Sequence, residues 1–318
     1  MNQSSERSRV LVLMGGPGEE HDISLQTGGE IARALRQTDE YEVFDVVIDQ
    51  PTLDELALII EAHQADVVFP ALHGRWGEGG ELQELLEEIG VTYIGSRPRP
   101  AMLAMDKIAT KAILSAERIP TPPSRQLLPE DECDLPTPLV LKPVDEGSSV
   151  DMRICHTIED VQQARKDLHP KHHRLLAEQY IHGRELTVGI LGGEALPILE
   201  IIPAVEFYDY EAKYERVDTQ YIVNPDLPEG IAQQCKNNAL LAYRKLGCRD
   251  LARVDFMLDH RGPWILEVNT MPGFTTHSLV PMAAQSLGRD MPQICAELVE
   301  TALARADISP SPMHPASP

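Results

Sequence analysis

Apolar and polar positions follow two different periods through the first hundred residues. Short runs rich in β-branched residues are typical of strands, whereas apolar residues spaced three and four apart are typical of amphipathic helices. The pattern predicts strands at residues 9–16, 41–48, 66–74 and 91–95, and helices at 22–37, 53–62 and 81–90. Asp22 or Ser24 is the expected cap of the first helix. Alternating strands and helices favour a parallel sheet whose ligands bind beyond the carboxyl ends of its strands.

The pattern changes after about residue 105. Strands at 138–143, 152–155 and 174–181 and helices at 106–118 and 158–167 indicate a small α+β unit. From about Glu185 a third part follows, with strands at 185–191 and 195–202, a helix at 229–247, a hairpin at 252–269 and further helices to about residue 306. We therefore predict three parts, at residues 1–104, 105–184 and 185–307, and a disordered Pro/Ser-rich tail at 308–318.

The hairpin segment ARVDFMLDHRGPWILEVN raises a question of charge. A three-residue loop, with Gly262 at the position that favours positive φ, pairs Asp259 with Pro263 and therefore Asp255 with Glu267. Arg253 and Asn269 pair on the same face, and the opposite face is wholly apolar, comprising Val254, Phe256, Leu258, Trp264, Leu266 and Val268. Facing carboxylates destabilise a sheet unless a cation lies between them. A divalent metal such as Mg²⁺ and simple damping by Arg253 explain this face equally well.

Composition and charge narrow the class of protein. The 318 residues have an ordinary share of apolar and charged residues, a net charge of −22 and five scattered cysteines. No apolar run is long enough to span a membrane, and no secretory signal is found at the N-terminus. We expect a cytoplasmic protein with reduced thiols that does not have nucleic acid or an anionic membrane as its main partner.

Two loops carry groups that suit a nucleotide. Lys142 ends a strand and precedes a Gly-Ser-Ser run, a combination that binds phosphate, although a solvated turn explains it as well. Glu178 and Glu185 flank the tight segment 179–183, which could bind an adenine edge and a ribose, but taken alone the segment is better explained as a plain connection between strands. Residues 206–224 hold four tyrosines and Lys213, and are typical of a lid that excludes water, with an irregular hairpin as the alternative.

Seven segments in order resemble the D-alanine–D-alanine ligases, a family of ATP-grasp carboxylate–amine ligases. They run through most of the chain and read MGGPGEEHDISL, ALHGRWGEGG, AMDKIATK, LKPVDEGSSV, FYDYEAKY, GCRDLARVDF and LEVNTMPGFTTHSL. The resemblance implies an α/β and α+β architecture: an ATP-grasp fold preceded by a Rossmann-like parallel-sheet domain. It also implies ATP-dependent joining of two D-alanines through an acyl phosphate, for peptidoglycan precursor synthesis.

The resemblance assigns residues to ATP and to metal ions. Phosphate contacts fall to Lys107, Lys142, Lys213 and a closing loop with Ser149, adenine contacts to Glu178, Tyr180 and Ile181, and the ribose to Glu185. Two Mg²⁺ ions, or Mn²⁺, would be held by Asp255, Glu267 and Asn269, with Glu267 bridging them. The metal ions would neutralise the facing carboxylates of Asp255 and Glu267 in the hairpin.

The resemblance also assigns residues to the two amino-acid substrates. Glu20 would bind the first ammonium near His73, and Ser148 and Tyr214 would link the lid to Glu20. Arg253 would oppose developing negative charge and Gly273 would supply a backbone donor, while the second carboxylate would meet Ser278 and Leu279. Tyr214 points to the dipeptide, because relatives that make D-alanyl-D-lactate tend to carry Phe there. The homodimer common among relatives is expected here as well.

Three positions depart from the family pattern and bear on the alternatives. Asp151 stands where glycine is usual, and its carboxylate should weaken ATP binding unless it points away; Gly18 and Gly79 replace a usual serine and aspartate. A ligase with another amine or hydroxy-acid acceptor is the nearest alternative function. A nucleotide-binding scaffold without turnover is the other alternative, and it would require the loss of metal ligands or phosphate lysines that this chain retains.

Overall fold

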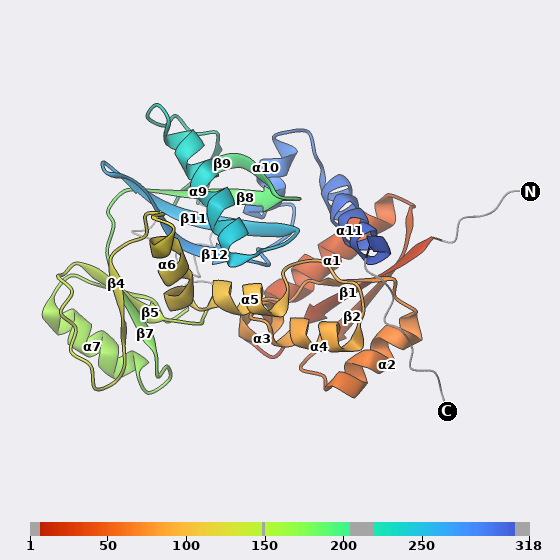
Figure 1. Cartoon of the computed structure of the whole chain (residues 1–318), viewed down its shortest axis with the longest axis horizontal. Helices are drawn as coiled ribbons and strands as arrows, with labels where there is room; N and C mark the ends of the chain where they lie inside the picture. The colour runs from red at the N-terminus through yellow and green to blue at the C-terminus, as the bar shows by residue number, and fades with distance from the viewer. Residues whose placement is uncertain (1–6, 148–149, 204–218, 309–318) are drawn as a thin grey trace, which may run out of the picture.

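The computed structural model describes residues 7–147, 150–203 and 219–308, without the side chains of 307 and 308. Ser148, Ser149, Lys213 and Tyr214, most of the predicted lid and nearly all of the predicted tail therefore lie outside the described residues. The described chain forms three sheets, which lie in three regions of the molecule (Figure 1). The domain boundaries predicted from the sequence stay predictions.

The first sheet is parallel and is centred on β1 (Ser8–Gly15), between β2 (Tyr41–Ile48) and β3 (Val67–Pro70). Alternate residues of β1 enter two different cores. Val10 and Val12 pack with α1 (His21–Gln37), while Leu11 and Leu13 pack with α2 (Leu53–His63) and α4 (Glu81–Ile89). Helices thus cover both faces of the sheet, as its strongly apolar central strand requires.

Several elements of this region differ from the sequence prediction. Segment 91–95 makes only an isolated bridge, between Val68 and Tyr93, and β3 ends at Pro70. The first helix has Glu20 at its N-cap, so neither predicted cap is used; Ser24 Oγ instead donates to Ala71 O and accepts from Gly15 N. The short helix α3 (Gly74–Glu78) and helix α5 (Pro98–Met105) were not predicted, because glycines and prolines interrupt their apolar patterns.

The second sheet is antiparallel, in the order β4-β7-β5-β6, and packs against α7 (Ile158–Leu168). Its strands are β4 (Ser124–Leu127), β5 (Leu139–Pro143), β6 (Arg153–Cys155) and β7 (Leu175–Gln179), and α6 (Lys107–Ala116) leads into it from the first region. Strand β4 lies at the edge directly after a proline run, which is where proline is tolerated next to a sheet. Those prolines are the reason the sequence did not predict β4.

The third sheet is antiparallel, in the order β10-β9-β8-β11-β12. It comprises β8 (Arg184–Leu191), β9 (Glu194–Ile202), β10 (Gln220–Val223), β11 (Leu251–Asp259) and β12 (Gly262–Asn269). One apolar cluster joins it to α9 (Ile231–Leu246). Another joins it to α10 (Leu279–Gln285), α11 (Met291–Ile308) and α1, so that the C-terminal helices pack beside the first sheet (Figure 1).

The hairpin β11–β12 confirms the predicted pairing of carboxylates. Asp255 faces Glu267 and Arg253 faces Asn269. Gly262, at φ +128°, has the positive φ expected of it. The turn itself was predicted wrongly: Asp259 pairs with Gly262, which leaves a two-residue loop.

A β-bulge at Leu266 absorbs the residue that the shorter turn releases. The partner of Phe256 is Ile265 rather than Leu266, and Ile265 is fully buried in the core. Leu266 therefore leaves the predicted apolar face, as does Trp264, whose ring lies under Arg261. Bulges re-aim side chains in this way near functional sites, and alternation of residues alone cannot locate them.

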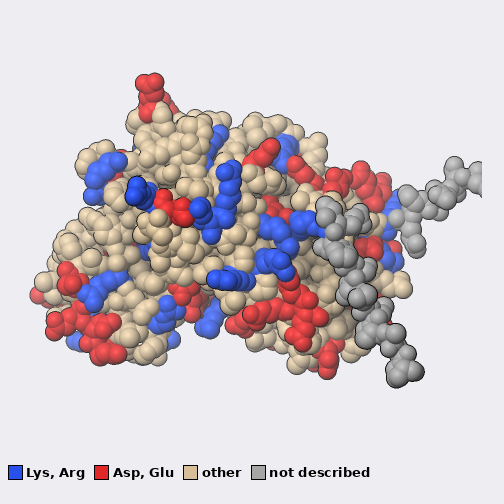
Figure 2. Space-filling model, in the orientation of Figure 1, with Lys and Arg blue, Asp and Glu red and all other residues tan. Residues whose placement is uncertain are grey.

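The charged side chains on the surface and the free cysteines are those expected from the composition of the chain. Acidic side chains gather at the lower left, the lower right and the upper right of the face shown in Figure 2, and most of the visible basic side chains lie across its middle. All five cysteines are free thiols; four are buried and Cys133 is half-buried. Among the described residues, no helix is both long and apolar enough to cross a membrane.

Candidate active site

Two neighbouring cavities open onto the face of β11 that carries Arg253, Asp255 and Met257. The small cavity has a volume of about 320 Å³ and lies between α1, α3 and the connector 270–278, which joins β12 to α10. The large cavity has a volume of about 610 Å³ and lies between the second and third sheets. Every described residue that the sequence nominated lines one cavity or both. The small one has Glu20, His73, Arg253, Asn269, Gly273, Ser278 and Leu279; the large one has Lys142, Glu178, Tyr180, Ile181, Glu185 and Asp255; and both have Lys107 and Glu267.

The wall shared by the two cavities combines opposite charges. Lys107 Nζ lies 3.7 Å from Glu267 Oε2 and donates to the backbone oxygen of Glu146 over 2.5 Å. Lys107 is buried although it is the first residue of α6, and Asp106 caps that helix by accepting from Ala109 N. A ligand group that passes from one cavity to the other therefore meets an ammonium and a carboxylate together.

The large cavity is built around a buried carboxylate that is held by two lysines. Glu178, which is only 2% exposed, lies 2.5 Å from Lys142 Nζ through Oε1 and 2.8 Å from Lys111 Nζ through Oε2. Burial alone would raise the pKa of Glu178, but the two ammonium groups outweigh burial and lower that pKa to about 2. Burial lowers the pKa of Lys111, whereas Glu178 and Glu267 outweigh burial at Lys142 and raise its pKa. Lys142, whose charged form is favoured, thus lines the cavity beside Glu178, with Lys111 on the other side of that carboxylate.

Apolar side chains complete the large cavity. Val140 and Ile154 come from the second sheet, and Met257 and the bulged Leu266 come from the third. The connector between β7 and β8 passes the same space and contributes Tyr180. A slot with apolar walls, an adjacent backbone segment and lysines at one end can hold a flat base and its phosphates.

The carboxylate face between the cavities is partly neutralised by the protein itself. Arg253 donates to Asp255 from Nε and from one terminal nitrogen, each over 2.9 Å, and Thr187 Oγ1 donates to Asp255 Oδ1 over 2.7 Å. Asn269 Oδ1 accepts from Met271 N over 3.0 Å. Within the described part of the chain, no three Asp, Glu, His or Cys side chains are grouped to hold a metal ion. The predicted set of two carboxylates and one amide has only oxygen ligands, which suits Mg²⁺, but a cation would share Asp255 with Arg253.

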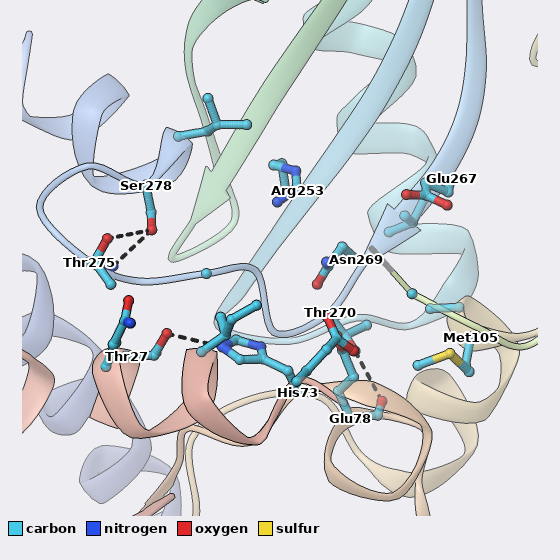
Figure 3. Close-up of a pocket in the computed structure, with 18 of the residues that line it drawn as sticks. Thr27, His73, Glu78, Met105, Arg253, Glu267, Asn269, Thr270, Thr275 and Ser278 are labelled. Carbon is cyan, nitrogen blue, oxygen red and sulfur yellow. Dashed lines mark hydrogen bonds between the residues drawn. The ribbon is translucent and has the colours of Figure 1, made fainter. Parts of the chain in front are cut away.

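The small cavity brings together residues far apart in the sequence (Figure 3). Arg253, Glu267 and Asn269 project from β11 and β12, while Thr27 and His73 approach from the first region. A Cβ added to Gly147 would lie 3.3 Å from Glu20 Oε2, so this carboxylate lies against the start of the predicted phosphate loop.

The connector 270–278 closes the small cavity on the side of α10. Ser278 Oγ accepts from Thr275 N over 2.9 Å and lies 2.9 Å from the Thr275 hydroxyl (Figure 3). A Cβ at Gly273 would come within 3.2 Å of Ser278 Oγ, so glycine permits this close turn. The turn presents backbone groups and a hydroxyl at the cavity, which is suited to a small carboxylate.

Asp151 points to cations of the protein. Its carboxylate is 2.9 Å from His172 Nε2, 3.2 Å from Lys171 Nζ and 3.8 Å from Arg153. Burial would raise the pKa of Asp151, but the hydrogen bonds from His172 and Lys171 lower it. Val150 and Met152 line the large cavity, whereas Asp151 is not part of that lining. The carboxylate therefore takes the orientation in which it need not weaken ATP binding.

Sequence reasoning missed several residues of the site. Lys111, Thr27, Met271 and Glu78 contact the predicted residues or line the cavities. Lys111 had a usable signal, since it lies four positions after Lys107 and therefore on the same face of a helix. Glu78 had none, because it reads as part of a polar glycine-rich loop.

Glu78 is 5% exposed and lies at the floor of the small cavity. Burial and the nearby carboxylate of Glu20 raise the pKa of Glu78 to about 8. Burial also lowers the pKa of His73, against the attraction of Glu20, and so favours the neutral imidazole. The small cavity thus contains groups whose charge is costly, in contrast to the neutralised lysine–glutamate cluster of the large one.

Two segments of the chain match models of known protein families. Residues 52–96 match the model of the D-Ala–D-Ala ligase N-terminus, and residues 113–300 match that of the C-terminus. A D-alanine–D-alanine ligase of Bordetella petrii is 41% identical over 95% of this chain and 97% of its own length. That of Pelotomaculum thermopropionicum is 40% identical over 94% of this chain and 98% of its own.

Solved structures agree with the sequence relatives. A D-alanine–D-alanine ligase of Bacillus anthracis complexed with ATP superposes with a TM-score of 0.83 at 33% identity, covering 96% of this chain and all of the other. The Coxiella burnetii enzyme gives 0.82 at 28% identity, over 96% of each chain. These neighbours confirm the ATP-grasp fold expected from the sequence. The chain belongs to the D-alanine–D-alanine ligase family.

Proposed function

We propose that this protein joins two molecules of D-alanine into D-alanyl-D-alanine while ATP is converted to ADP and phosphate. The observation that carries the proposal is the pair of cavities that meet at Lys107 and Glu267. One cavity suits a nucleotide and the other suits small zwitterions, so a phosphoryl group and an amino-acid carboxylate can meet at their common wall. Close relatives over nearly the full chain support the same reaction.

In the proposed first step, a carboxylate oxygen of one D-alanine attacks the γ-phosphorus of ATP. The phosphorus–oxygen bond to ADP breaks, and an acyl phosphate results. Lys107 and Lys142 would orient the phosphates, and Glu20 would hold the ammonium of this D-alanine. Arg253 would oppose the negative charge that develops on the transferring group, which is the largest contribution expected of a side chain in such chemistry.

In the proposed second step, the amine of another D-alanine attacks the acyl carbon. A carbon–nitrogen bond forms, phosphate leaves and the amine loses a proton. The backbone N–H of Gly273 would donate to the oxyanion, and Ser278 with Leu279 would receive the carboxylate of the acceptor. Ser148, Ser149, Lys213 and Tyr214 keep their predicted roles in closing the site over the phosphates.

A divalent metal fits this site by the chemistry of its ligands. Asp255, Glu267 and Asn269 would hold Mg²⁺, and the ion would supply a positive charge that neutralises phosphate oxygens. Arg253 already neutralises part of the charge of Asp255, so the ion would share that carboxylate with Arg253.

The cellular setting follows from the same proposal. D-alanyl-D-alanine would serve peptidoglycan precursor synthesis in the cytoplasm, and a homodimer is the proposed assembly. Light scattering during size-exclusion chromatography would measure the mass of the assembly directly.

The test of the proposed function is release of ADP by the purified protein with Mg²⁺ and ATP. D-alanine alone, L-alanine alone, and D-alanine with D-lactate or D-serine are compared, and products are identified by mass. Turnover with D-alanine alone that yields the dipeptide supports the proposal. Activity only with D-lactate or D-serine present would mean that the acceptor is not D-alanine and that the acceptor site in the small cavity was assigned wrongly. Bound ATP without any turnover would favour a nucleotide-binding scaffold.

A further inference from the structure

The peptide unit of Met271 is held from both sides by residues of the first region. Its N–H is shared between Glu78 Oε2, at 3.3 Å, and Asn269 Oδ1, at 3.0 Å, and its carbonyl oxygen lies 3.0 Å from His73 Nδ1. Thr270 Oγ1 donates to the backbone oxygen of Glu78 over 3.4 Å (Figure 3). All of these groups are buried or nearly so. The start of the connector 270–278 is therefore fastened to α3 and to the residue that precedes it.

These contacts determine the proton position on His73. A carbonyl oxygen can only accept, so Nδ1 of His73 carries the hydrogen and donates it to Met271. In the neutral ring Nε2 then accepts from the hydroxyl of Thr27, which lies 3.0 Å away. Both ring nitrogens are thus engaged with protein groups, and His73 acts here as a bridge from α1 to the connector.

The carboxyl group of Glu78 also has two partners. Oε1 accepts from Gly74 N over 3.1 Å, while Oε2 accepts from Met271 N. Two backbone N–H donors require two acceptor oxygens, which a carboxyl group has and an amide, with one oxygen, does not. The first contact closes α3 on itself, and the second joins α3 to the connector.

Met271 lies two residues before Gly273, which is packed against Ser278. Glu30 Oε2 accepts from Thr276 N over 2.7 Å, so the C-terminal end of the connector is also attached, to α1. Displacing one attachment would move the backbone groups that face the small cavity while leaving the large cavity, whose lining includes neither Glu78 nor Met271, in place.

We propose that Glu78 is a positioning residue for the second substrate: by holding the N–H of Met271 it fixes Gly273 and Ser278 where the acceptor must bind. The inference rests on the proposed function. Glu78 itself need not touch either substrate. Its loss should slow attack by the acceptor amine more than formation of the acyl phosphate, because only the former depends on the connector.

The test uses a competition between two nucleophiles. Hydroxylamine attacks the acyl carbon of an acyl phosphate, forming a hydroxamate and releasing phosphate, and it has no carboxylate that must be positioned. With ATP, D-alanine and hydroxylamine in one mixture, the ratio of dipeptide to hydroxamate reports how well the acceptor is placed. The ratio is independent of how much of the preparation is folded, since both products come from the same active molecules.

For Glu78→Gln we expect the ratio to fall about tenfold, as for loss of one buried hydrogen bond at the reacting centre, with the KM for ATP unchanged. Glu88→Gln, which removes an exposed carboxylate from α4, is the matched control and should leave the ratio unchanged. Thr27→Val deletes the hydroxyl that donates to His73 and keeps the side-chain shape. It should lower the ratio in the same direction but by less.

An unchanged ratio in Glu78→Gln would overturn the inference, even if total activity fell, because dipeptide and hydroxamate would then depend equally on Glu78. If Glu78→Gln does not fold, Thr27→Val decides in the same way. Absence of dipeptide from the unaltered protein would instead refute the proposed function, and the inference would fall with it.

Discussion

Two buried glutamates, one in each cavity, respond to burial in opposite ways. Glu178 and Glu78 are 2% and 5% exposed, yet the pKa of Glu178 is lowered to about 2 and that of Glu78 is raised to about 8. Burial acts on both in the same direction. The difference comes from their neighbours, because Glu178 has two ammonium partners within 2.8 Å, whereas Glu78 has two backbone N–H groups and lies near Glu20.

The contrast shows that the two halves of the site are built by different means. The large cavity holds opposite charges in balance, so that lysines needed for phosphates stay charged without water around them. The small cavity relies on hydrogen-bond geometry around a backbone connector, where one misplaced N–H moves the next residues. Changes of charge should therefore disturb the first half most, and small changes of shape the second.

The largest effect is expected where the two halves meet. Glu267→Gln keeps the size of the side chain but removes a charge that both cavities share, so kcat should fall by roughly a hundredfold or more. Nucleotide binding, measured by calorimetry, and the thermal midpoint should change little. Near-normal ADP release by this variant would refute the proposed metal role of Glu267 and the idea that the shared wall is catalytic.

The next test breaks the charge balance of the large cavity. Glu178→Gln leaves Lys142 and Lys111 buried beside each other, and removing one partner of a buried ion pair costs about 3–5 kcal/mol of unfolding free energy. Lys111→Met in the same protein should recover part of that loss, because one uncompensated ammonium is then absent. Urea unfolding of the two single variants and the double variant forms a complete cycle. Effects that simply add would mean that these groups do not act as a balanced cluster.

A third test uses the opposite signs of the two pKa shifts. Between the usual glutamate pKa of about 4.3 and its folded pKa of about 8, Glu78 holds a proton that the unfolded chain has lost, so stability should fall as pH rises, by at most about 1.4 kcal/mol per pH unit. Glu178 contributes stability above the usual pKa that is lost as pH falls towards its folded pKa of about 2.

Urea midpoints measured between about pH 5 and pH 9 should therefore converge with those of Glu78→Gln at the acid end and separate from them at the alkaline end. Glu20, Arg253 and His73 act electrostatically on Glu78 or respond to the same neighbours, so the comparison must be made as a difference between the two proteins. If the urea midpoints of the two proteins change with pH in parallel, Glu78 is ionised throughout this range. The pKa values of Glu78 and Glu178 would then not differ in the direction described above.

Periodicity predicted the part of this site that lies on the hairpin, whereas residues such as Glu20, Gly273 and Ser278 were assigned by the resemblance of their segments to the family. The pairing of Asp255 with Glu267 follows from alternation and one turn, and it is correct. The bulge at Leu266 was missed because a shorter turn and a bulge compensate each other and leave the same carboxylates paired. Alternation therefore predicted the polar face correctly, and four of the six residues of the apolar face.

Other parts of the site depend on contacts between regions. The hydrogen bond between Glu78 and Met271 joins residues 193 positions apart. The sequence around Glu78 and the sequence around Met271 each give no sign of this contact or of the burial of Glu78. Lys111 follows from helical spacing, but its partner Glu178 lies on strand β7 of the second sheet, which helical spacing does not indicate. Local rules thus identify which residues carry charge, while the tertiary arrangement decides which charge is compensated.

The smallest effect is expected at Asp151, where a charged cluster is much less buried than that around Glu178. Asp151 has φ +53°, a conformation that favours glycine, so Asp151→Gly should relieve backbone strain while losing the contacts to Lys171 and His172. These two effects act in opposite directions on the stability of the segment around Asp151. Because its carboxylate points to the protein's own cations, we expect the KM for ATP to be unchanged or raised, by no more than about threefold. Asp151→Asn is the control, since asparagine tolerates positive φ and removes only the charge. A lowered KM in both variants would mean that the carboxylate acts on the phosphates after all, and that charge near the large cavity matters even where the protein's own cations screen it.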